Sequence, residues 1–241
     1  MTKSRVRVSS TFLRSVFLAL TFIAALAGCG PSIDPAAKAD IDGRIAALRA
    51  GPNAFPSPTG FEPMPFAAGQ WTQYKMTDDK GQPSFFTQKI VGSDAGAFWI
   101  ETLHEAYTGK TAQRMLVAFG NRTDPSSADI RAVQIKDHKG QVTEMPMGMM
   151  PLLQSTYRGA LASLVIRWQG LPQETQSVPA GRFDGCYKAR TEAQWGPYKT
   201  VSDSWSHPAV PLSGTVKSVG IDKPYTMELV GFGTSGAMSE F

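Results

Sequence analysis

Residues 97–119 read AFWIETLHEAYTGKTAQRMLVAF, and this stretch decides the fold. Residues 113–119 have the alternation of a β-strand, with Met115, Val117 and Phe119 on one face. Residues 97–103 form a second short run, and Tyr107-Thr108-Gly109-Lys110 between the two is typical of a turn. The stretch therefore predicts two consecutive antiparallel strands.

The first of these strands is apolar on both of its faces. Phe98 and Ile100 share one face, while Trp99 and Leu103 share the other. A strand with this pattern is covered on both sides by other parts of the protein. We therefore expect the sheet to carry material on each of its faces here.

Short runs separated by turn residues continue along the chain. Asp137-His138-Lys139-Gly140 lies between two such runs and is a hairpin signal. Further strands are predicted at residues 71–76, 85–91, 130–135, 141–145, 174–178, 183–193, 199–204, 215–219 and 225–230. This succession of short strands and turns predicts an antiparallel meander.

Two helices accompany the strands. The first begins with Asp34 as its N-cap and Pro35 at its first helical position, and Gly51-Pro52 ends it. The second begins at Pro151 and carries an apolar stripe at helical spacing: Leu153, Tyr157, Leu161 and Leu164. A curved sheet needs apolar cover on its concave side, from a helix or a ligand. The predicted fold class is α+β, with a curved antiparallel β-sheet (a half-open barrel) wrapped around an amphipathic helix.

Residues 51–69 contain five prolines and form an extended, semi-rigid linker by composition. Two arrangements are open for this linker. It could hold the folded body away from a membrane, or it could lie along the body with Phe55, Phe61 and Phe66 tucked in.

The N-terminus has the pattern of a secretory leader. Four basic residues precede an apolar run over residues 16–26, which is shorter than the roughly 20 residues that cross a bilayer as a helix. The basic residues are Lys3, Arg5, Arg7 and Arg14. Such a segment predicts export from the cytoplasm.

Leu26-Ala27-Gly28-Cys29 ends this leader and resembles the lipobox of bacterial lipoproteins. The resemblance implies cleavage between Gly28 and Cys29 and a lipid on Cys29, so that the membrane is a partner through acyl chains contributing about 0.8 kcal/mol per methylene. An uncleaved anchor with Cys29 as an ordinary thiol is the alternative. Gly30 replaces the aspartate of inner-membrane retention signals, which implies the outer membrane, periplasmic face.

The charge balance changes when the leader is removed. The whole chain has 24 basic and 20 acidic residues, and residues 1–28 hold four of the basic ones and none of the acidic ones. The remaining chain is therefore neutral, with lysine and arginine scattered singly. This distribution argues against a nucleic-acid partner, which would require a basic patch.

Cys186 is left without a partner when Cys29 is acylated. An oxidising compartment normally uses cysteines in pairs. We interpret Cys186 as a small apolar side chain within a strand, with an intermolecular or redox role as the alternative.

Two segments carry a resemblance to a known fold family. Residues 177–183 read SVPAGRF, and residues 204–218 read SWSHPAVPLSGTVKS ahead of a final strand. Both are similar to segments of the LolA/LolB-like half-barrel group of periplasmic proteins. The resemblance implies a sheet curled around a helix with an apolar cavity, which holds lipoprotein acyl chains in the carrier members.

Residues 145–150 read MPMGMM and lead into the second predicted helix. Flexible, polarizable methionines suit an adaptable apolar lip beside a cavity or a partner surface. The candidate contact residues for an apolar ligand are Met145, Met147, Met149, Met150, Leu153 and Tyr157. Binding of Cu(I) by the thioethers is the weaker alternative.

No constellation in the sequence indicates an enzyme. His104, His138 and His207 lack the spacing of metal ligands, so surface or packing roles are expected. Residues 231–236 match G-x-G-x-x-G, but too little chain follows for a βαβ unit, so this is a glycine-rich tail. We expect no catalytic residues, no metal and no cofactor.

The predicted organisation has three parts: a signal peptide at residues 1–28, a lipidated tether with a helix and linker at 29–69, and a half-barrel domain at 70–241. The first functional hypothesis is a lipoprotein that binds an apolar ligand or acyl chain in the half-barrel. The second is a structural or accessory subunit of an envelope complex, whose core is filled by its own side chains. The state of the cavity distinguishes the two.

Overall fold

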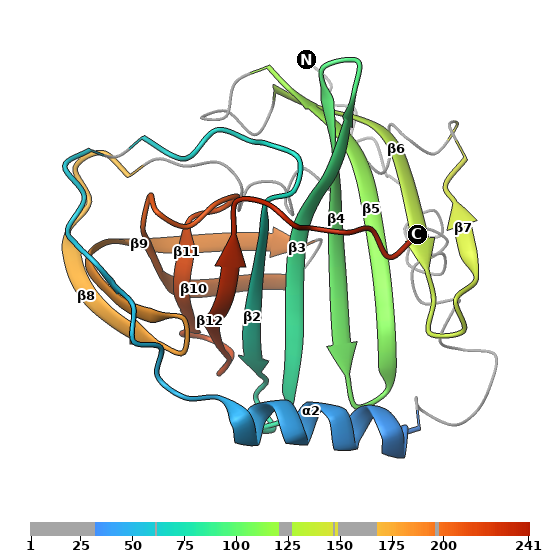
Figure 1. The fold of residues 1–241 in the computed structure, drawn as a ribbon, viewed down its shortest axis with the longest axis horizontal. Helices are drawn as coiled ribbons and strands as arrows, with labels where there is room; N and C mark the ends of the chain where they lie inside the picture. Colours follow the sequence, from blue (N-terminus) through green and yellow to red (C-terminus); the bar gives the residue numbers. More distant parts are fainter. Residues whose placement is uncertain (1–31, 61, 121–126, 147, 149–167, 196–197) are drawn as a thin grey trace, which may run out of the picture.

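A computed structural model of the chain describes residues 32–60, 62–120, 127–146, 148, 168–195 and 198–241. Its element order is one helix followed by strands (Figure 1). The leader, including Cys29, and the predicted helix from Pro151 lie outside the described residues. None of the helices in the described ranges has the length and apolar character needed to cross a membrane.

The helix α2 spans Pro35–Ala47, as its sequence signals predict. The carboxylate of Asp34 accepts hydrogen bonds from the amides of Ala36 and Ala37, and Pro35 takes a first-turn position where no N–H is needed. The helix ends four residues before Gly51, since Leu48 already adopts an extended conformation. Ile41 is the residue that this helix buries.

Twelve strands of very different lengths follow α2 in the described chain. They are β1 (Ala54–Phe55), β2 (Trp71–Thr77), β3 (Pro83–Asp94), β4 (Ala97–Ala106), β5 (Gly109–Phe119), β6 (Ala128–Lys136), β7 (Val142–Glu144), β8 (Gln173–Val178), β9 (Gly181–Trp195), β10 (Tyr198–Ser206), β11 (Thr215–Gly220) and β12 (Thr226–Gly233). Every predicted strand is confirmed, and β1 is the strand that the sequence pattern did not predict.

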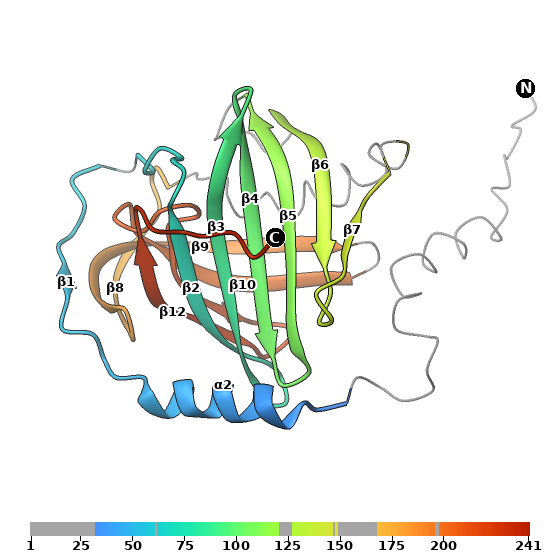
Figure 2. The ribbon, with the colours of Figure 1, turned by 45° about the vertical axis from the view of Figure 1, so that its right-hand side comes forward.

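These strands form one sheet in the order β1-β9-β10-β11-β12-β2-β3-β4-β5-β6-β7, with β8 paired to β9 beside this path. The pairings are antiparallel except for the short parallel pairing of β1 with β9. Because β12 pairs with β2, the C-terminal strands continue directly into the N-terminal meander. The sheet curves so strongly that β9 and β10 pass behind β2–β6 (Figures 1 and 2).

The inner face of β2–β6, which we define as the face carrying Ile90, Ile100 and Met115, holds the first core cluster. Leu212, from the loop after β10, completes this cluster. A second cluster lies around Phe183 and Leu229. The curved antiparallel sheet of the prediction is therefore observed, with apolar side chains packed in clusters against it.

The opposite, outer face of β3 and β4 is also covered. Helix α2 packs at one end of it, where the Arg44 guanidinium lies 3.9 Å from the centre of the Phe85 ring and 3.1 Å from Glu105. The C-terminal residues 234–241 cross the same face in Figure 1. This accounts for the apolar pattern on both faces of β4. The described helix thus lies on the outside of the sheet, and a helix inside the curve stays a prediction.

The linker lies along the body. Phe55 stacks on Phe183 with ring centres 4.3 Å apart, and Phe66 packs edge-on to Phe98 at 5.7 Å. The linker approaches Gly181 closely at Asn53, since a Cβ added to Gly181 would lie 2.6 Å from the Asn53 carbonyl oxygen. Gly181 also has φ +142°, which favours glycine. Of the two arrangements left open, the docked one is correct for Phe55 and Phe66, while Phe61 lies outside the described residues.

Two glycines of the tail motif, Gly231 and Gly233, have a packing role beside Trp71. Gly233 still belongs to β12, and a Cβ at this position would lie 2.5 Å from the indole nitrogen of Trp71. The missing side chain lets Trp71 lie across the strand. This local reason explains the match to the dinucleotide pattern, and the following residues form an extended tail.

Candidate functional site: a proline-lined groove

The loop of residues 207–214 belongs to the second of the two segments that resemble LolA/LolB-like proteins, and it contacts the first, residues 177–183. Its ends are joined by the His207 amide, which donates to the Gly214 carbonyl at 2.8 Å. Within the loop, Val210 joins the second core cluster and Leu212 joins the first. The segment of residues 177–183, which ends within β9, meets this loop at Phe183, whose ring packs edge-on to the His207 imidazole at 5.5 Å.

His207 is buried and uses both of its ring nitrogens. Nε2 lies 3.1 Å from the Pro56 carbonyl oxygen, while Nδ1 accepts the Ala209 amide at 3.2 Å. Since a carbonyl can only accept, the proton must sit on Nε2, and the ring is neutral. Burial lowers the pKa of His207, which keeps it so. The imidazole therefore fastens the linker to the loop and has no nitrogen left for a metal or a proton transfer.

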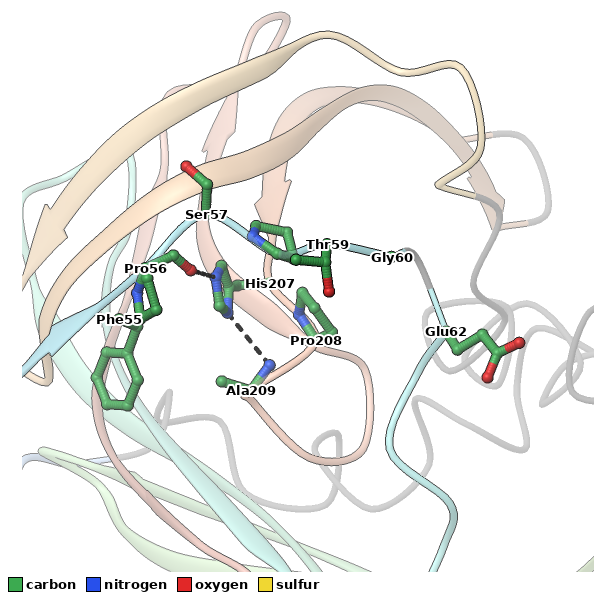
Figure 3. A pocket seen from close by; sticks show the side chains of 10 residues that line it. Phe55, Pro56, Ser57, Thr59, Gly60, Glu62, His207, Pro208 and Ala209 are labelled. Atoms are coloured by element: carbon green, nitrogen blue, oxygen red, sulfur yellow. Dashed lines mark hydrogen bonds between the residues drawn. The ribbon is translucent and has the colours of Figure 1, made fainter.

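A groove of about 610 Å³ opens beside this contact (Figure 3). Its apolar walls come from Phe55, Pro56, Pro58, Pro208 and Ala209, and its polar rim from Ser57, Thr59, Gly60 and Glu62. In Figure 3 the His207 ring lies between Pro56 and Pro208, and Glu62 lies apart at the far end.

The groove is held in a fixed shape by its backbone. The prolines fix φ at their positions, and the Asn53 carbonyl accepts the Arg182 amide at 2.9 Å. Further along the linker, the Tyr187 hydroxyl donates to the Gly60 carbonyl at 3.0 Å. Rigid apolar walls with a few polar groups at the rim suit binding by shape and burial rather than by charge.

The structure places few of the candidate contact residues predicted from sequence. Met145 is half-buried against the first core cluster, and its amide donates to the Val133 carbonyl at 3.0 Å. Outside the described residues lie Leu26, Ala27, Gly28, Cys29, Met147, Met149, Met150, Leu153 and Tyr157. The methionine lip and the lipidation site therefore stay predictions.

Cys186 is fully buried in β9 and is a free thiol, as predicted. Burial raises the pKa of this thiol to about 12. The thiolate that a redox or nucleophilic role needs is therefore not formed at physiological pH.

Two features of the structure were missed by sequence reasoning. One is strand β1, whose two residues are too few to show any period, although docking of Phe55 was one of the two arrangements left open. The burial of Glu101 on the outer face was also missed, although its position between Trp99 and Leu103 on an apolar face was a readable signal. Among the described side chains, no three His, Cys, Asp or Glu residues gather at one point.

Comparison with known proteins adds little to this geometry. No family model and no curated protein matches the chain. Among solved structures, the chain is similar to a protein described as a "putative lipoprotein" from Parabacteroides distasonis, with 13% identity and a TM-score of 0.35, over 74% of this chain and 97% of that one. At these values the similarity supports no conclusion about function, and the likeness to LolA/LolB-like proteins stays a prediction.

Proposed function

We propose that the protein is a non-enzymatic lipoprotein of the cell envelope, anchored through acylated Cys29, that presents a rigid β-sheet body to a partner protein. The basic N-terminus, the short apolar run and the exit at Leu26-Ala27-Gly28-Cys29 support the anchor. Gly30 in place of an aspartate supports the outer membrane, with the body on its periplasmic face.

The packing of the protein's own side chains inside the described sheet supports the choice of an accessory role. Leu212 and Val210 are 1% exposed and insert from one loop into the two core clusters. Phe55 and Phe66 add to the same clusters from the linker. Within the described residues, the protein's own side chains thus occupy space that a carrier would leave for an acyl chain. A partner would then bind at the surface, where the groove offers a preformed concave site.

Carriage of an apolar ligand is the second candidate, and the groove itself favours it. Its volume of about 610 Å³ lies within the range of roughly 300–1,000 Å³ typical of small-molecule sites. Its walls are mostly proline and phenylalanine carbon. A single alkyl chain or a partner's apolar side chain would meet the same surface there.

Photo-cross-linking in intact cells separates these candidates. A photoreactive residue replaces exposed Thr59 in the groove, and a matched control replaces exposed Lys80 in the turn between β2 and β3. We expect Thr59 to yield one discrete protein adduct and Lys80 none. A lipid adduct at Thr59, together with lipid co-purifying in native mass spectrometry, would favour carriage. Equal patterns at both positions would remove the groove as the contact site.

The anchor has its own test. Cys29→Ala is expected to move the protein from the membrane fraction to the soluble fraction and to leave the leader uncleaved by the lipoprotein peptidase. The mass of the wild-type N-terminal peptide should show a diacylglyceryl cysteine. An unmodified cysteine in that peptide would contradict the lipoprotein assignment, whatever the groove binds.

A further inference from the structure

A buried ion pair lies on the outer face of the sheet. Lys89 on β3 and Glu101 on β4 are paired across the two strands, and they are 8% and 0% exposed. The Lys89 ammonium lies 3.5 Å from the Glu101 carboxylate. Neither group has a role in the groove, which is formed by other elements.

The segment of residues 234–241, which we call the strap, lies over this pair. Figures 1 and 2 show it running from the end of β12 across β3, β4 and β5, on the side away from β9 and β10. Glu101 accepts the Ser239 hydroxyl at 2.7 Å and the Glu240 amide at 2.9 Å. Lys89 donates to the Met238 carbonyl at 3.0 Å and to the Glu240 carboxylate at 2.7 Å.

The end of the strap meets two further cations. The Arg114 guanidinium lies 4.5 Å from the centre of the Phe241 ring and 4.9 Å from that of Trp99. Gln134 fixes this guanidinium by accepting its Nε–H at 2.7 Å. Lys136 donates to the Glu240 carbonyl. The sheet thus offers a separate partner for the hydroxyl, the acidic group, the aromatic ring and the backbone of the strap.

Contacts of this kind select a sequence rather than merely cover a surface. Apolar residues would cover the sheet without the desolvation that a buried ion pair requires. A buried carboxylate must find donors, and here both strap donors reach the two oxygens of Glu101. Any residue except proline supplies the amide, whereas the hydroxyl requires a side chain such as that of Ser239, so the face discriminates between segments through the second donor.

The strap is also attached in a way that permits exchange. Residues 234–236 are exposed and connect it to β12. Within the described chain, its backbone-to-backbone hydrogen bond with the body is the Ala237 amide donating to the Gly69 carbonyl at 3.0 Å, and no strand ladder is formed. Met238 is 79% exposed and projects an apolar side chain outward. The strap therefore resembles a bound peptide more than a strand of the sheet.

We propose that the outer face around Lys89, Glu101, Arg114 and Lys136 is a peptide-recognition site that the strap occupies in cis. Its partner is an extended protein segment that presents a hydroxyl, an acidic and an aromatic side chain at consecutive positions. The tether gives the strap an effective concentration in the millimolar range, so a partner must displace it. This site is distinct from the groove and does not depend on the lipid anchor.

A strap-weakened protein makes the site measurable. The full chain carrying Ser239→Ala, Glu240→Ala and Phe241→Ala keeps its length but loses the specific side-chain contacts. A fluorescent peptide of residues 234–241 is titrated against this variant and against the wild type, with anisotropy as the readout. We expect the variant to bind the peptide at least about tenfold more tightly than the wild type, because its own strap competes less. The control peptide carries the same three substitutions and should not bind.

Adding Arg114→Gln to the strap-weakened protein should reduce peptide affinity, since the ring loses its cation. The melting temperature of each variant shows whether it is folded. If the strap-weakened chain does not fold, the wild type is used with millimolar peptide, and displacement is read as faster hydrogen exchange at the Glu240 amide. A folded variant that binds neither peptide, or both equally, would overturn the proposal, as would unchanged exchange in the wild type.

Discussion

At the scale of single residues, Leu212 combines a strained backbone conformation with complete burial of its side chain. It has φ +61°, in the left-handed region, and is 1% exposed. That conformation costs a residue with a Cβ roughly 1–2 kcal/mol, while burying a leucine contributes about 1.5–3 kcal/mol. Burial outweighs strain, so a leucine remains where glycine would fit the backbone.

Two substitutions separate strain from packing at this position. Leu212→Ala should lower the free energy of unfolding by about 3 kcal/mol, because it opens a cavity and keeps the Cβ. Leu212→Gly removes the same contacts but relieves the strained φ. We therefore expect glycine to be no less stable than alanine here, whereas it is usually about 1 kcal/mol worse in regular elements. Urea unfolding of both variants gives their free energies of unfolding. A glycine variant clearly less stable than the alanine variant would contradict the prediction.

His207 predicts a specific dependence of stability on pH. Burial lowers its pKa in the folded state below the unfolded value of about 6.5. As the pH falls below about 6.5, the unfolded chain takes up a proton first, so the wild type loses stability on acidification. The contribution of the neutral ring is therefore complete above that pH and declines below it.

His207→Gln tests this sign. At pH 7.5 the variant should be less stable by about 1–3 kcal/mol, because the Pro56 carbonyl and the Ala209 amide lose a well-placed partner. Between pH 7.5 and pH 5.5 the gap between wild type and variant should narrow, as only the wild type carries the imidazole. Urea unfolding at several pH values measures the gap. A gap that stays constant or widens towards low pH would show that the ring is not held neutral by burial.

At the scale of elements, the strands were predictable because alternation and turn chemistry are local. Asp137, for example, accepts the amides of Lys139 and Gln141, which closes the hairpin that its turn sequence predicts. What could not be predicted is long-range pairing. Nothing in the sequence near Ala54 shows that it will pair in parallel with Arg182, and nothing near Glu101 shows which distant segment supplies donors to its carboxylate.

The docking of β1 rests chiefly on the ring of Phe55. Besides stacking on Phe183, it lies 5.5 Å from the Phe232 ring. Phe55→Ala should lower stability by about 2–3 kcal/mol and loosen the linker, since a half-buried aromatic contact is lost. Phe55→Leu, the matched control, should retain most of the stability that the Phe55 side chain contributes. Hydrogen exchange at the Arg182 amide, which donates to Asn53, should accelerate in the alanine variant alone. Unchanged exchange there would mean that the rings do not hold the linker.

At the scale of the whole molecule, the parts before β2 are integrated into the body. Helix α2 contributes buried Ile41 and the Arg44–Glu105 ion pair. The linker contributes Phe55, Phe66 and the Pro56 carbonyl that holds His207. The sheet order reinforces this, because β1 extends the far side of β9 while β2 sits at the centre of the path. The tether proposed from sequence at residues 29–69 is therefore packed against the body through Ile41, Arg44, Phe55, Pro56 and Phe66.

Two chains of different length test that integration. A chain beginning at residue 32 should unfold in one cooperative transition, whereas a chain beginning at Gln70 should lose roughly 5 kcal/mol or more, because Ile41, Phe55 and Phe66 each contribute about 1.5–3 kcal/mol of burial. The loss should also uncover Phe183 and leave the His207 Nε2–H without its carbonyl. Urea midpoints and m-values of the two chains measure this directly. If the shorter chain has the same midpoint, residues 32–69 are a dispensable tether, and the groove, which needs residues 55–62, is not part of a stable body.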